Sequence, residues 1–191
     1  MADEELIRNL GPLGPLAGTW EGDQGLDVAP SKKHGKKETS FREHMTFEPF
    51  GPVVNGSQSL YALRYRTTIW PLGEENPFHE EVGYWLWDAE AKQVLRCFIV
   101  PRGIAVEAGG TAEPSDTTLT MQADVGSETY GVLSNRYLDQ HAKTVSYRLT
   151  VTIHDGNSFS YEEDTLLQIA GQSDVFHHTD KNTLRRITAA S

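Results

Sequence analysis

The clearest indication of the fold class is the segment Val145–Ile169, VSYRLTVTIHDGNSFSYEEDTLLQI. Its first ten residues alternate apolar and polar side chains, which is the period of a β-strand with one buried face. Asp155-Gly156-Asn157 then supplies residues that readily adopt positive φ in a tight turn, and Ser158–Ile169 returns as a second strand. The pattern predicts an antiparallel β-hairpin.

Similar strand patterns fill most of the remaining chain, whereas helical spacing is not sustained beyond residue 16. The predicted strands outside the hairpin are Ser57–Ile69, Phe78–Asp88, Val94–Val100, Thr117–Val125 and Asn182–Thr188. Long loops are expected over Asp27–Lys37 and Asn135–Lys143. Sequential hairpins leave two exposed sheet edges unless the sheet closes on itself. We therefore predict an all-β fold, a single antiparallel up-and-down β-barrel of about ten strands with an internal cavity, although a β-sandwich fits the same pattern.

The chain has 191 residues, the size of one ordinary domain. Its start carries several leucines interrupted by Gly11-Pro12 and Gly14-Pro15, which predicts a short helical segment. We accordingly expect an N-terminal helical plug over residues 1–15 and a barrel domain over residues 16–191.

The charge balance bears on the partners. Seventeen basic and 27 acidic residues give a formal net charge of −10, which disfavours nucleic acid and anionic membranes. The sequence has no apolar run long enough for a transmembrane helix and no secretory signal, so a cytoplasmic location is expected. The single cysteine, Cys97, excludes an internal disulfide framework. We expect a small-molecule ligand in the cavity, and a homodimer is left open.

Two segments carry a family resemblance. The first is Gly18-Thr19-Trp20-Glu21-Gly22-Asp23-Gln24-Gly25, and the second is the run FHHTDKNTL at Phe176–Leu184. Together they resemble the nitrobindin-like family, haem-binding β-barrels related in shape to fatty-acid-binding proteins. Gln24 stands where the last glycine of the family motif belongs, and the residues after His178 are polar where the family places an apolar one.

The resemblance implies a specific cofactor and site. The expected cofactor is haem b, with His178 as the axial ligand of its iron and with Gly18, Trp20 and Gly22 among the cofactor-binding residues. A ferric iron with an open sixth position would bind nitric oxide, and the family is described as isomerising peroxynitrite to nitrate. The candidates for the distal wall of such a pocket are Val82, Tyr84, Leu86, Phe98 and Val100.

Other interpretations of the same residues stay open. In an extended strand His177 points to the face opposite His178, and Asp180 could simply hold a histidine in a polar turn. A haem-free carrier of a small hydrophobic or acidic ligand is the alternative function. In that case Glu162 or Asp164 would face the interior and pair with an arginine, and the candidates are Arg64, Arg66 and Arg148. A domain with a filled interior that binds a partner is a third interpretation.

Overall fold

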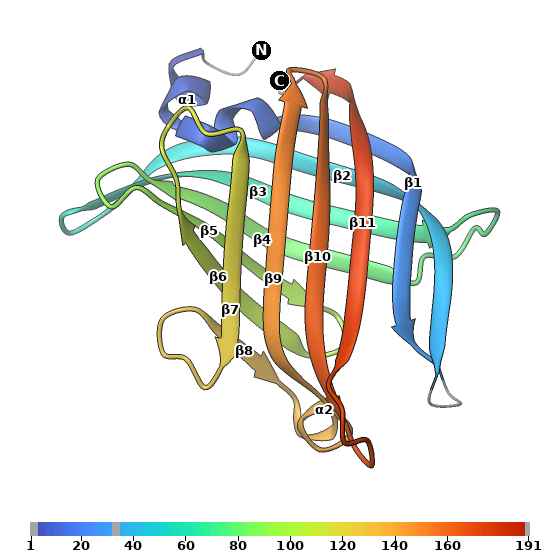
Figure 1. The fold of residues 1–191 in the computed structure, drawn as a ribbon. Helices are drawn as coiled ribbons and strands as arrows, with labels where there is room; N and C mark the ends of the chain where they lie inside the picture. Colours follow the sequence, from blue (N-terminus) through green and yellow to red (C-terminus); the bar gives the residue numbers. More distant parts are fainter. Residues whose placement is uncertain (1–3, 32–34, 190–191) are drawn as a thin grey trace.

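The structure, a computed structural model, describes residues 4–31 and 35–189. In this part of the chain, eleven strands close into a barrel (Figure 1). The elements are α1 (Glu4–Asn9), the 3₁₀ helix η1 (Gly11–Leu16), β1 (Gly18–Pro30), β2 (Lys36–Asn55), β3 (Gln58–Pro71), β4 (His79–Asp88), β5 (Gln93–Val100), β6 (Ile104–Thr111), β7 (Thr118–Val125), β8 (Gly131–Ser134), α2 (Arg136–His141), β9 (Ala142–Asp155), β10 (Ser158–Ile169) and β11 (Phe176–Ala189).

Neighbouring strands in the barrel are mostly neighbours in sequence. The order is β1-β11-β10-β9-β7-β8-β6-β5-β4-β3-β2. The barrel closes where β1, the first strand of the chain, pairs antiparallel with β11, the last strand. The short pairing of β7 with β8 is parallel, and every other pairing is antiparallel among the described residues. The predicted all-β barrel is confirmed, with eleven strands where about ten were expected. No helix among the described residues is long and apolar enough to cross a membrane.

The predicted hairpin is present as β9 and β10, with Ser158 opposite Asp155. Other expectations were wrong. A long loop over residues 27–37 is not found, because β1 continues to Pro30 and β2 begins at Lys36; residues 32–34 lie outside the described part. The loop over residues 135–143 contains α2, whose first turn is capped by the Asn135 side chain accepting from Leu138 N.

The final strand begins at Phe176 rather than at Asn182. Its pairing with β10 runs from Phe176 opposite Leu167 to Arg185 opposite Ser158. The polar run that contains His178 is therefore part of the barrel wall rather than a loop before it.

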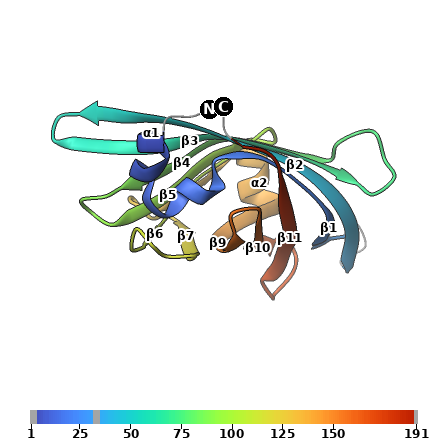
Figure 2. The ribbon, with the colours of Figure 1, turned by 90° about the horizontal axis from the view of Figure 1, so that it is seen from above.

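One end of the barrel is closed by α1 and η1 (Figures 1 and 2). The two Gly-Pro pairs of η1 restrict this segment to a short 3₁₀ helix, whose apolar side chains turn inward. Leu10, Leu13 and Leu16 are fully buried there. The Trp20 indole Nε1 donates to Leu16 O at 2.7 Å and fixes η1 against β1. This end, the helical end, is filled by aromatic and aliphatic side chains.

Candidate functional site

The inward face of β11 changes character along its length. Leu184 is buried in the apolar core near the helical end, and Asn182, Asp180 and His178 follow on the same face. His178 therefore lies toward the opposite end of the barrel, which we call the far end. The barrel interior is apolar at the helical end and polar toward the far end.

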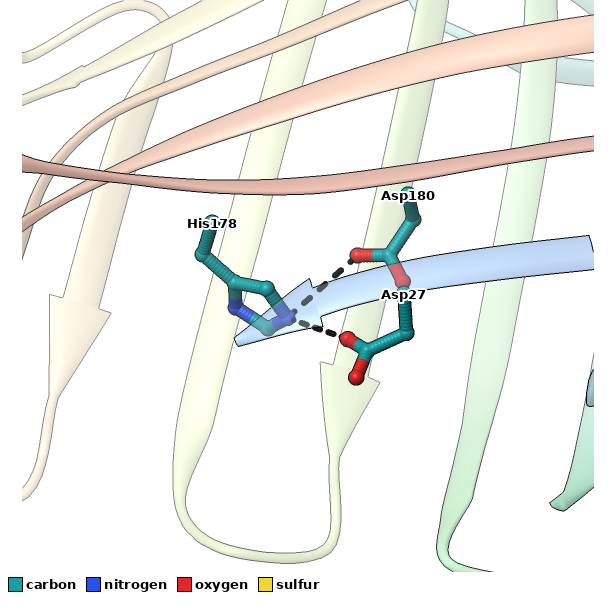
Figure 3. Close-up of side chains that lie close together, drawn as sticks. All are labelled: Asp27, His178 and Asp180. Atoms are coloured by element: carbon teal, nitrogen blue, oxygen red, sulfur yellow. Dashed lines mark hydrogen bonds and ion pairs between the residues drawn. The ribbon is translucent and has the colours of Figure 1, made fainter. Parts of the chain in front are cut away.

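At the far end, His178 meets two aspartates from the two strands that close the barrel (Figure 3). The β1–β11 register places Asp27 directly opposite Asp180, and His178 is two residues before Asp180 on the same face. His178 Nε2 lies 2.8 Å from Asp27 Oδ1 and 3.5 Å from Asp180 Oδ2. An ionised carboxylate can only accept, so the imidazole donates its Nε2–H to Asp27.

This His178 cluster, composed of Asp27, His178 and Asp180, is partly accessible. The side chains are 7% exposed for Asp27, 30% for His178 and 19% for Asp180. Burial raises the pKa of Asp180 to about 9, and the negative charges of Glu163 and Asp27 act in the same direction. At neutral pH Asp180 is therefore protonated, and Asp27 is the carboxylate that accepts the hydrogen bond of the His178 imidazole.

The opposite side of the interior holds a buried arginine, Arg96 on β5. Its guanidinium pairs with Glu81 of β4 at 2.5 Å and with Glu163 of β10 at 2.9 Å. Tyr65 and Tyr147 also accept from it, and each tyrosine donates to one of the two carboxylates at 2.7 Å. We call these five residues the Arg96 cluster.

Two carboxylates share one guanidinium in the Arg96 cluster, and their acidities diverge. Burial alone would raise the pKa of Glu81, but Arg96 and the nearby His79 lower it to about 2. Burial raises the pKa of Glu163 to about 7; Arg96 opposes this shift and Glu81 adds to it. Glu81 therefore holds the charge that neutralises Arg96, while Glu163 is the group that exchanges a proton near neutral pH.

Another buried carboxyl belongs to Glu43 on β2. It accepts from Thr67 at 2.7 Å, from Tyr161 at 2.9 Å and from Asn182 at 3.0 Å. Burial raises the pKa of Glu43 even though these hydrogen bonds favour the ionised form. Sequence analysis missed both this group and Arg96, because their partners come from strands far apart in the chain.

The structure does not bring all the predicted site residues together. Trp20 pairs in register with Arg186, eight residues beyond His178 on β11 and roughly 26 Å along the strand. Trp20 is fully buried at the helical end, where Cζ of the Arg186 guanidinium lies 4.2 Å from the centroid of the Trp20 ring. Gly18 has a φ of +137° there, and a side chain on Gly22 would meet Thr183 O at 2.5 Å.

His177 points outward, as alternation predicted. Its Nδ1 lies 2.8 Å from Asp164 Oδ2 on the outer surface, and its side chain is 63% exposed. The pair resembles the contact of His178 with Asp27 but has only one carboxylate.

Several expected inward residues face outward instead. Val82 and Tyr84 are exposed on the outer face of β4, whereas Phe98 and Val100 are buried. Glu162 is exposed, and Glu163 is the residue of that strand which meets a buried arginine. Its partner is Arg96, while Arg64 and Arg66 form exposed ion pairs with Glu48 and Glu80. The arginine–carboxylate set expected inside the barrel exists, but with other members.

Two pockets lie along the wall. The larger, about 830 Å³, is lined mainly by outward side chains of β2 to β6 and β8, with Val82, Tyr84 and Ile99 among them. The smaller, about 370 Å³, is lined by residues of β1, β9, β10 and β11, including Glu163 and Asp180 of the two clusters. The smaller pocket thus reaches the polar part of the barrel wall.

The fold and this cluster define a class, a closed β-barrel in which an inward imidazole, His178, lies beside buried carboxylates, with a second inward imidazole, His79, paired with Glu81. A family model described as "THAP4-like, heme-binding beta-barrel domain" matches residues 9–186. The chain belongs to this haem-binding β-barrel family, and the resemblance to nitrobindin-like proteins seen in the sequence is confirmed.

The crystal structure of Rv2717c from M. tuberculosis has the same fold. It superimposes with a TM-score of 0.65 at 19% sequence identity and covers 93% of this chain and 96% of that chain. No curated protein matches the sequence.

Proposed function

We propose that this protein binds haem b at the far end of the barrel, with His178 as the axial ligand of the iron. The proposal rests on the hydrogen bond of the His178 imidazole, which engages Nε2. Nε2 is held by Asp27, and Figure 3 shows Nδ1 on the side of the ring away from both aspartates. A metal-binding histidine usually donates its second N–H to a carboxylate in this way.

The donor set therefore fits one axial bond. In the neutral imidazole, donation of Nε2–H to Asp27 leaves the lone pair on Nδ1. The carboxylate makes the imidazole more basic, which strengthens its bond to a metal. Asp27 and Asp180 then act by orienting the ring rather than by contacting the iron.

The surrounding charge favours an oxidised iron. The Asp27 carboxylate, 2.8 Å from Nε2, lies beside the ring and stabilises positive charge close to His178. Haem iron with an open sixth position supplies Lewis-acid chemistry toward small anions and nitric oxide. Glu163, whose pKa burial raises to about 7, can hold or release a proton at neutral pH beside Arg96.

The finer function follows from this arrangement. We propose that the ferric protein binds nitric oxide and isomerises peroxynitrite to nitrate, as the nitrobindin resemblance implies. Stopped-flow decay of peroxynitrite with nitrate analysis tests this step. The proposal requires faster decay and a higher nitrate yield than the same concentration of His178→Ala protein gives.

Titration of untagged protein with haemin tests the binding proposal. Wild-type protein and the His177→Ala variant should each show a saturable one-to-one Soret band, and His178→Ala should lose it. His177→Ala is a matched control because it removes a neighbouring histidine that also contacts an aspartate. Equal binding by His178→Ala and wild type would refute the assignment of the ligand.

One observation weighs against the carrier of acidic ligands. Arg96 is the arginine buried inside the barrel among the described residues, and Glu81 and Glu163 already pair with it. A ligand carboxylate would have to displace one of these partners and would enter a region rich in negative charge. A cytoplasmic location and a homodimer stay predictions from the sequence.

A further inference from the structure

We propose that Asp27, His178 and Asp180 also form a site for a divalent first-row transition-metal cation, which the protein binds when it holds no haem. This inference goes beyond the proposed haem function and does not depend on it. It rests on the spacing of the three donors, on their chemistry and on the charge around them.

The spacing is that of ligands around one small cation. With metal–ligand bonds of about 2.1 Å, neighbouring ligands lie about 3.0 Å apart in octahedral and about 3.4 Å apart in tetrahedral coordination. The distances from His178 Nε2 are 2.8 Å to Asp27 Oδ1 and 3.5 Å to Asp180 Oδ2. One ligand atom from each of the three residues lies within 4.8 Å of the others.

The backbone sets this spacing. Asp27 and Asp180 are register partners on two paired strands, and His178 is the next inward residue of β11. Directly opposed and diagonal side chains on one face of an antiparallel pair lie within reach of a common point. The donors are therefore held by the strand pairing that closes the barrel and need little reorganisation.

The two aspartates of the His178 cluster favour the binding of a cation. In the described part of the chain, the ion pairs of Asp27 and Asp180 are with His178 alone. The two aspartates are register partners of β1 and β11, so their side chains lie side by side on one face of the sheet. A divalent cation bound between these two side chains would be attracted to both carboxylates.

The donor types indicate the class of cation. One imidazole nitrogen with two carboxylate oxygens suits Mn²⁺, Fe²⁺, Co²⁺ or Zn²⁺, whereas Mg²⁺ and Ca²⁺ prefer oxygen ligands only. The 30% exposure of the His178 side chain leaves a path for the ion and for water to fill the other coordination positions.

Cation and haem would exclude one another on this imidazole. The cation takes Nε2, so the remaining ring proton moves to Nδ1, the nitrogen that we assign to the haem iron. A bound divalent cation would thus be displaced as haem binds.

Titration of untagged, haem-free protein with Co²⁺ tests the site, because bound Co²⁺ gives visible absorption bands that report its ligands. Asp180→Asn and Asp27→Asn keep the side-chain shape and remove a charged donor. His177→Ala is the matched control, since His177 has a single carboxylate partner on the outer face. Circular dichroism checks that each variant is folded.

The proposal requires one Co²⁺ per chain, displaced by Zn²⁺ and not by equal Mg²⁺. It also requires affinity at least about tenfold weaker in each asparagine variant and unchanged affinity in His177→Ala. Absence of bands up to about 1 mM Co²⁺, or equal affinity in wild type and both asparagine variants, would overturn it. The measurement uses no haem, so failure of haemin binding leaves its outcome unaffected.

Discussion

Arg96→Met removes the buried guanidinium of the Arg96 cluster while keeping a long apolar side chain. Glu81 and Glu163 then lose their common cation, and the hydroxyls of Tyr65 and Tyr147 lose a donor. Removing one partner of a buried ion pair leaves uncompensated charge in a low-dielectric interior. We expect the free energy of unfolding to fall by about 3–5 kcal/mol at pH 7.

The loss should depend on pH in a definite direction. The folded pKa of Glu81, about 2, lies below its ordinary value of 4.5, so its ion pair stabilises wild type above pH 4.5. The stabilisation by this ion pair disappears as the pH falls toward 2, because Glu81 is then protonated in the folded and in the unfolded protein. The difference between wild type and Arg96→Met should therefore narrow below pH 4.5.

Urea denaturation followed by tryptophan fluorescence measures this difference, since the Trp85 ring lies beside the guanidinium at 5.5 Å. Arg66→Met is the control, because Arg66 forms an exposed ion pair with Glu80 on the outer face and should change stability little. A loss below about 1 kcal/mol, or one that stays constant between pH 3 and 8, would refute the reasoning about Arg96.

Three further variants probe the barrel by urea denaturation. Burial raises the pKa of Glu163 in the folded protein from 4.5 to about 7, so the free energy of unfolding of wild type should fall by up to about 3 kcal/mol as the pH rises from 4.5 to above 7. The Glu163→Gln variant should show a smaller fall over the same pH range. An unchanged pH dependence in this variant would contradict the role of Glu163. Leu13→Ala at the helical end should cost about 2–5 kcal/mol, while the exposed Leu133→Ala should cost little; equal costs would argue against the packing of η1. Gly83→Ala places a Cβ 1.9 Å from Cys97 O and should destabilise by at least about 2 kcal/mol, whereas Gly156→Ala meets no atom within 4 Å; comparable stability of the two would count against this backbone approach.

The hairpin Val145–Ile169 could be predicted because its apolar residues alternate with polar ones and its turn residues are distinctive. Strand β2 could not be predicted, because Pro49 and Pro52 interrupt its sequence and because a glutamate such as the buried Glu43 is typical of a surface position. The start of β11 was missed because polar side chains face the barrel interior there, as Glu43 does in β2. Its inward side chains include His178 and Asp180, which are polar and so give no contrast with their outward neighbours.

The candidate site was only partly within reach of sequence analysis. His178 was selected through a family resemblance, and alternation correctly set His177 on the other face. Asp27 carries no such signal, because it lies 151 residues from His178 and meets it only where the barrel closes. Arg96 and Glu163 are likewise joined across 67 residues by the closed sheet.

A crystal structure of the haemin-reconstituted protein tests the central claim most directly. We predict iron bonded to Nδ1 of His178, with Nε2 still hydrogen-bonded to Asp27 at the far end of the barrel. Iron bound to another residue, or haem seated in the larger outward-lined pocket beside Val82 and Tyr84 with the His178 cluster unchanged, would contradict this assignment.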